Sequence, residues 1–113
     1  MEIGLMLRLT EQREVKLSGH AVEALAAMCE LYIAEKLKAR GEGTAEEGKC
    51  ARIYKLYQRF AGRLMAKDQK TFSFGFSPGE RGDLLEMLLY AMPRVGVYEQ
   101  TVGRQVMMDL RLS

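Results

Sequence analysis

The residues best suited to chemistry are cations that recur every three or four positions between residues 49 and 67. Side chains at that spacing share one face of a helix, and no acidic residue occurs between the first and the last of them. The row consists of Lys49, Arg52, Lys55, Arg59, Arg63 and Lys67. Because ammonium and guanidinium groups donate hydrogen bonds to carboxylates and phosphates, the row predicts a face that binds anions.

Three interpretations of this basic face compete. In the first, it is a solvated surface, partly neutralised by the acidic turn before it or by Glu23, Glu30 and Glu35 of the preceding helix. In the second, it binds the phosphate backbone of a nucleic acid, which needs no base contacts. In the third, it binds the acidic surface of another protein.

The nucleic-acid interpretation has less support than the row alone would give it. The net charge of the whole chain is only +2, because acidic residues elsewhere offset the basic segment. Tyr54, Tyr57 and Phe60 are expected on the buried stripe of the same helix, where they cannot stack on bases. We therefore keep nucleic-acid binding as the alternative to an acidic protein partner.

The cysteines and the single histidine do not form a catalytic pattern. Cys29 and Cys50 lie at different heights of a predicted helical hairpin, offset by roughly 13 Å at 1.5 Å per residue. That offset is too large for a disulfide, so both are expected as buried free thiols. His20 lies nine residues before Cys29, on the opposite side of the helix, and is expected at the surface.

The loop Gly75–Gly82 is the nearest approach to a phosphate site. It joins a predicted strand to a helix start, with Arg81 close to the exposed backbone amides. It lacks the Gly-Lys-Ser/Thr ending of a P-loop, and Glu80 and Asp83 would repel an anion. We interpret it as ordinary helix capping, and the sequence predicts no metal, cofactor or small-molecule substrate.

The positioning elements follow from the hydrophobic periodicity. Alternation of period two predicts strands, and apolar residues at three- and four-residue intervals predict helices. Strands are predicted at 2–10 and 70–76, with weaker indications at 15–17 and 95–98. The segment 11–18 is ambiguous: 15–17 is favoured as the second arm of a hairpin, and a short helix capped by Thr10 is the alternative. A last strand is predicted at 105–113. Helices are predicted at 19–40, 45–68 and 77–92, the last with Ser77 as cap and Pro78 at its first position.

This order, β(β)ααβαβ, predicts an α+β fold. We expect a small mixed β-sheet of three to five strands, with about three helices packed on one face. The chain of 113 residues is expected to form a single compact domain.

The sheet face away from the helices is the predicted self-association surface. With the alternating leucines of 2–10 directed inward, Met6 and Arg8 face outward, and Met107 and Arg111 do so in the last strand. Flexible methionines suit surfaces that adapt to a partner. Homo-oligomerisation through this face is therefore expected, with isolated exposed apolar groups as the alternative.

Together these features predict a non-enzymatic interaction or assembly protein. It would self-associate and bind an acidic partner through the basic helix. The first ten residues do not resemble a secretory signal, and the densest apolar run, 84–92, is nine residues long and includes an acid. No membrane association is expected, and the predicted location is the cytoplasm.

Overall fold

A computed structural model of the chain describes residues 13–39, 44–66 and 70–110. These residues form an α+β arrangement in which helices predominate. In chain order the elements are β1 (Arg13–Ser18), α2 (Gly19–Ala39), α3 (Thr44–Arg63), β2 (Thr71–Phe76), α4 (Pro78–Ala91), the 3-10 helix η1 (Met92–Arg94) and α5 (Val97–Asp109).

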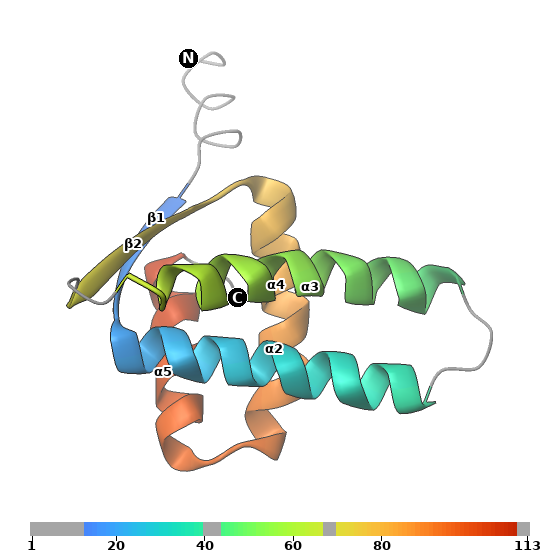
Figure 1. Ribbon diagram of the computed structural model, residues 1–113. Helices are drawn as coiled ribbons and strands as arrows, with labels where there is room; N and C mark the ends of the chain where they lie inside the picture. Colours follow the sequence, from blue (N-terminus) through green and yellow to red (C-terminus); the bar gives the residue numbers. More distant parts are fainter. Residues whose placement is uncertain (1–12, 40–43, 67–69, 111–113) are drawn as a thin grey trace, which may run out of the picture.

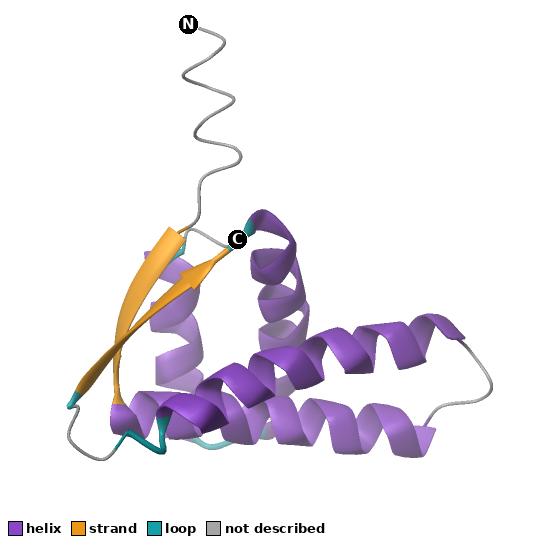
Figure 2. Cartoon of the chain, turned by 45° about the horizontal axis from the view of Figure 1, so that its top comes forward, coloured by secondary structure: helices purple, strands orange, loops and turns teal. Residues whose placement is uncertain are grey.

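The long helices α2 and α3 run antiparallel, and α4 and α5 cross behind them (Figure 1). The two strands close one end of the α2–α3 hairpin, as a second view shows (Figure 2). α2 is the central element, because it contacts α3, α4, α5 and both strands.

The sheet is an antiparallel pair, with Val15 opposite Phe74 and Leu17 opposite Phe72. Alternate side chains of a strand point to opposite faces, and β2 follows this rule closely. Its three phenylalanines are buried, whereas Thr71 and Ser73 are exposed. The alternation that predicts a strand at 70–76 is therefore confirmed, and the inner face is aromatic.

Local signals explain where two of the helices begin. The Ser18 hydroxyl accepts a hydrogen bond from the Ala21 amide at 3.2 Å, which caps α2. At α4, the Glu80 amide donates to the Ser77 hydroxyl while the Glu80 carboxylate accepts from the Ser77 amide. This reciprocal capping box confirms the predicted helix start.

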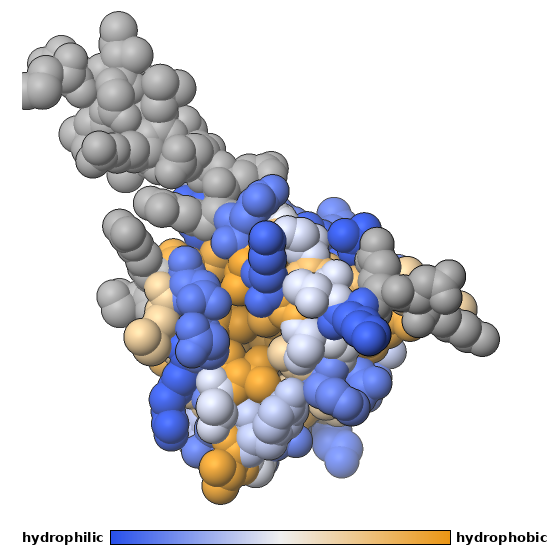
Figure 3. All heavy atoms as spheres, turned by 90° about the vertical axis from the view of Figure 1, so that its left-hand side faces the viewer, coloured by the Kyte–Doolittle hydropathy of each residue, from blue (hydrophilic) through white to orange (hydrophobic). Residues whose placement is uncertain are grey.

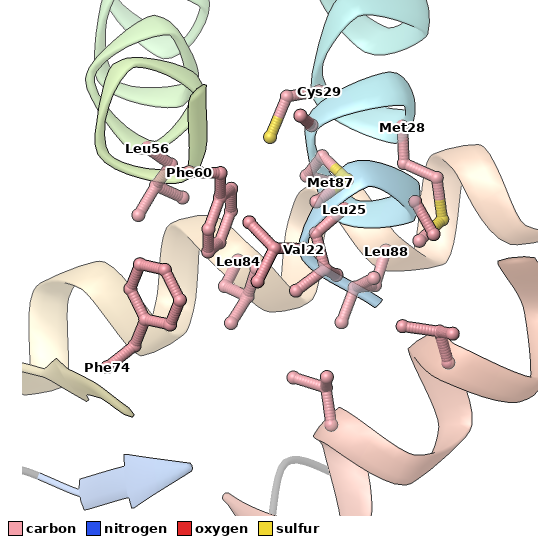
Figure 4. Close-up of a cluster of buried hydrophobic side chains, with 14 of the residues drawn as sticks. Val22, Leu25, Met28, Cys29, Leu56, Phe60, Phe74, Leu84, Met87 and Leu88 are labelled. Atoms are coloured by element: carbon pink, nitrogen blue, oxygen red, sulfur yellow. The ribbon is translucent and has the colours of Figure 1, made fainter. Parts of the chain in front are cut away.

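Side chains from α2, α3, α4 and β2 converge in one core (Figure 4). Phe60 of α3 packs edge-on against Phe74 of β2, with ring centroids 5.2 Å apart. Leu25, Phe60 and Leu84 are fully buried. Burial of such side chains stabilises the fold by about 1.5–3 kcal/mol each relative to exposure.

The predictions of strands at 95–98 and 105–113 are wrong, because α5 is a helix that covers most of this region. Its buried residues are Val102, Gly103 and Val106, and Leu110 follows them at the helix end. Spacings of four between Val102, Val106 and Leu110 fit a helix face. The same valine and leucine also fit a period of two, so the pattern alone was ambiguous.

Gly103 allows α5 to approach the end of α4 closely. A Cβ atom at this position would lie 2.8 Å from the Met92 sulfur and 3.4 Å from Leu88 Cδ2. Gly103 is therefore a contact point between helices.

The general α+β class is confirmed, but the details of the sheet differ from the prediction. Among the described residues the sheet has two strands, and four α-helices replace the predicted three. The strand at 15–17 is confirmed within β1, with β2 as its partner. The predicted strand at 2–10 and its hairpin lie outside the described residues.

Candidate functional site

The basic face of α3 lies against acidic residues of α4. Lys49 Nζ is 3.3 Å from Glu86 Oε1, Arg52 Nε is 3.0 Å from Asp83 Oδ1, and Arg59 Nη1 is 2.8 Å from Glu80 Oε2. The order of the pairs is reversed between the two helices: from Lys49 to Arg59 along α3, the partners on α4 run from Glu86 back to Glu80. The face that was expected to present free cations is therefore substantially neutralised within the chain.

The acids that neutralise these cations are not the ones that the sequence suggested. The alternatives were the acidic turn and the α2 residues Glu23, Glu30 and Glu35. The observed partners belong to α4, which crosses α3 behind the hairpin (Figure 1). Glu30 instead accepts a hydrogen bond from Tyr57 and thereby raises the pKa of that phenol.

Glu80 is held in its ionised form by this arrangement. Partial burial favours the neutral acid, but hydrogen bonding to Ser77 and the Arg59 guanidinium outweigh it. The net result is a pKa below the ordinary value of 4.5. Glu80 thus caps α4 and pairs with α3 at the same time.

Arg59 and Arg63 also cover one edge of the sheet. Arg59 Nη2 donates to the Gly75 carbonyl at 2.8 Å, and Arg63 Nη2 donates to the Ser73 carbonyl at 3.2 Å. Alternate residues of an antiparallel strand direct both backbone groups away from the partner strand. The two arginines therefore occupy the outer edge of β2, which would otherwise be open to another strand.

A hollow of about 280 Å³ lies where these side chains meet, lined by Arg59, Arg63, Ser73 and Phe74. Both guanidinium carbons lie over the Phe74 ring, at 5.8 and 5.7 Å from its centroid. Within the described residues, Arg63 has no carboxylate within ion-pair distance, whereas Arg59 has Glu80. Among the described residues, the hollow therefore keeps one guanidinium whose charge no neighbouring acid balances.

The other predicted cations differ in their surroundings. Lys55 is exposed, and it has no ion-pair partner in the part of the chain that the structure describes. Lys67 lies outside the described residues. Of the six predicted binding cations, the structure thus brings Arg59 and Arg63 together and ties Lys49 and Arg52 to α4.

The expectation that Tyr54 lies on the buried stripe of α3 is wrong. Phe60 is buried as predicted, but Tyr54 is exposed and stacks on the half-buried Tyr57, with centroids 6.0 Å apart. Tyr54 and Arg59 are five residues apart, which places them about 140° from each other around the helix. The exposed tyrosine is therefore not interleaved with the cations of the hollow.

The prediction that Met107 lies on a strand of the self-association face is wrong. Met107 lies on α5 rather than on a strand, and it is partly buried against the core. The next residue, Met108, is 72% exposed. Met6, Arg8 and Arg111 lie outside the described residues.

A second surface feature, which the sequence analysis missed, lies between α4 and α5. It is a groove of about 380 Å³ that is mainly apolar, with Arg104 as its charged member. Its remaining lining residues are Leu89, Met92, Pro93, Gln100 and Met107. The missed signal was the helical spacing of Gln100, Arg104 and Met107, which the predicted strand concealed.

The predicted states of the thiols and the histidine agree with the structure. Cys29 and Cys50 are free and buried. Burial, aided by the neighbouring Glu30 carboxylate, raises the pKa of Cys29 to about 12. His20 has a highly exposed side chain, 3.9 Å from Glu23.

Searches of the described residues for two other features give negative results. No group of three or more His, Cys, Asp or Glu side chains there is arranged to hold a metal ion. In the same residues, no helix combines the length and apolar character needed to traverse a bilayer.

The sequence analysis missed the acidic residues of α4 as ion-pair partners of the α3 cations. Glu80, Asp83 and Glu86 recur at intervals of three, as the cations of α3 do at three and four. Complementary charge stripes on two amphipathic helices are a usable signal. The sequence pattern assigned Glu80 to the helix cap, and it treated Glu80 and Asp83 as groups that would repel a phosphate.

Comparison of the chain with family models, curated proteins and solved structures found no match.

Proposed function

We propose that this chain is a non-enzymatic interaction protein that binds an acidic segment of a partner protein in the α3–β2 hollow. The observation that carries the proposal is the pair of guanidinium groups over Phe74, of which only Arg59 has an adjacent carboxylate among the described residues. A partner carboxylate would complete the charge balance at Arg63 and could also accept from the Ser73 hydroxyl.

Within the basic row, the proposed binding residues are those that no acid of α4 already occupies. Lys49 and Arg52 already face Glu86 and Asp83, so an incoming acid would have to compete with an existing ion pair there. The side chains of Lys55 and Lys70 are exposed and add long-range attraction. The partner's acid is therefore placed at Arg63, with Arg59 as a positioning neighbour.

The absence of a disulfide at Cys29 and Cys50 supports a cytoplasmic location as part of the same proposal. Buried cysteines that form no disulfide are compatible with a reducing compartment, where disulfides are rare.

Fluorescence anisotropy with a labelled hexaglutamate peptide tests the proposal. Arg63→Gln should weaken binding by roughly tenfold, as expected when one charge-assisted hydrogen bond is lost. Arg104→Gln is the matched control, because it removes an exposed arginine and the same charge from α5. Equal loss in both variants, or no loss in Arg63→Gln, would contradict a specific site.

The same assay with a single-stranded oligonucleotide tests the alternative of nucleic-acid binding. A nucleic-acid protein would bind the oligonucleotide more tightly than the peptide, with affinity falling steeply as salt rises. We expect the opposite preference, because Tyr54 lies on another flank of α3 from the cations.

A further inference from the structure

The two edges of the β1–β2 sheet are treated differently by the fold. The outer edge of β2 is covered by the side chains of Arg59 and Arg63. On β1, the residues opposite Ser73 and Gly75 are Lys16 and Glu14. Their backbone groups point away from β2 by the same alternation, and no described residue pairs with them.

Within the described part of the chain the β1 edge is uncovered, and such an edge can pair with another strand. We propose that the occupant is β1 of a second copy of this chain, joined antiparallel across a twofold axis. Two protein chains would thus share a four-stranded sheet. This inference concerns a different surface from the α3–β2 hollow and does not depend on the proposed function.

The charges on the edge select the register. Glu14 and Lys16 are both exposed, on the sheet face opposite the buried Val15 and Leu17. If the axis passes through residue 14 or residue 16, identical charges face each other. If it passes through Val15, Glu14 of each copy lies opposite Lys16 of the other, so two favourable pairs form together.

The backbone pattern of that register is consistent with the sheet. Glu14 and Lys16 direct their amides and carbonyls outward, so they form the hydrogen-bonded pairs between copies. Val15 meets Val15 of the second copy as the closer, non-hydrogen-bonded pair on the buried face. On the side of the molecule that carries the strands, hydrophobic residues are visible between hydrophilic ones (Figure 3).

Charge exchange provides the test, because both side chains are exposed and their replacement leaves the core unchanged. Sedimentation equilibrium of the full chain, from about 1 μM to about 1 mM, should show a dimer. Lys16→Glu and Glu14→Lys should each weaken association about tenfold, since each places like charges opposite one another twice. The double variant Glu14→Lys/Lys16→Glu restores both pairs and should associate as the unmodified chain does.

Lys38→Glu is the matched control, because it makes the same charge change at an exposed position of α2. It should leave the dimer unchanged. Backbone amide exchange gives a second measurement, in which the Glu14 and Lys16 amides should become protected as concentration rises.

Three outcomes would overturn the inference. One is a monomer over the whole concentration range. This outcome includes a monomer whose Glu14 and Lys16 amides are protected at every concentration, because the same chain then fills the β1 edge. The second is a dimer that neither single variant weakens. The third is a double variant that associates no better than the single ones.

Discussion

Arg59 and Glu80 join α3 to α4 at the point where β2 ends. The guanidinium donates to the Glu80 carboxylate at 2.8 Å and to the Gly75 carbonyl, also at 2.8 Å. The same carboxylate accepts from the Ser77 amide at the start of α4. One side chain therefore connects a helix, a strand edge and a helix cap.

Replacement of Arg59 by methionine should destabilise the protein by about 1 kcal/mol. The apolar stem is retained, but Gly75 and Glu80 lose their donor. The loss of stability is limited because the side chains of Arg59 and Glu80 are both about one-third exposed. Urea denaturation measures it, with Lys55→Met as the control, which should change stability by less than about 0.5 kcal/mol. Equal effects in the two variants would contradict the structural role of Arg59.

Glu80→Gln should make the protein less sensitive to acid. The folded state lowers the pKa of Glu80 below 4.5, so it favours the ionised carboxylate more strongly than the unfolded chain does. The resulting stability is present above the unfolded pKa and disappears as pH falls through the folded pKa. At neutral pH, the free energy of unfolding of the unmodified protein should exceed that of the variant by about 0.5 kcal/mol.

This difference should shrink as the pH falls below 4.5. Urea denaturation of both proteins at about pH 7 and about pH 3 measures it. A difference that stays constant across this range would show that the charge of Glu80 contributes nothing to stability.

Substitution of two helical glycines, Gly82 and Gly103, should change the stability of the protein in opposite directions. A Cβ at Gly82 in α4 would meet no atom within 4 Å, so Gly82→Ala should stabilise the protein by about 0.5–1 kcal/mol through helix propensity. Gly103→Leu should destabilise it by about 1–3 kcal/mol, because its side chain must displace Met92 and Leu88. Thermal unfolding of both variants checks the signs, and a stabilised Gly103→Leu would contradict the close approach of α5.

Both thiols should resist modification in the native protein. The raised pKa of Cys29, about 12, leaves almost no thiolate at neutral pH, and both sulfur atoms are buried. A colorimetric disulfide reagent should react slowly with the folded chain and label two thiols per chain after denaturation in guanidinium. Rapid labelling of the native protein would contradict this burial.

The fold was most predictable where the signal was local. The capping box at Ser77 and Glu80 requires residues only three positions apart, and it fixed the start of α4. The burial alternation of β2 depended only on side chains along the strand itself. In α5, by contrast, Val106 and Leu110 satisfied both periodicities, and contacts with other helices decided the outcome.

The basic row shows the same division in the candidate site. Its helical spacing was visible in the sequence, so the shared face of Arg52, Lys55 and Arg59 could be predicted. Its neutralisation could not be predicted from that spacing, because Asp83 and Glu80 are 31 and 21 residues away from their partners.

The sequence by itself determined which side chains lie on one helix face, where α4 begins and which face of β2 is apolar, since these depend on neighbours a few residues apart. Only the tertiary structure decided that α3 crosses α4 with acids opposite cations, and that Arg59 and Arg63 reach the β2 edge. The physical reason is that ion pairing acts over a few ångströms in space, and the chain brings those groups together only when its helices pack around a common core.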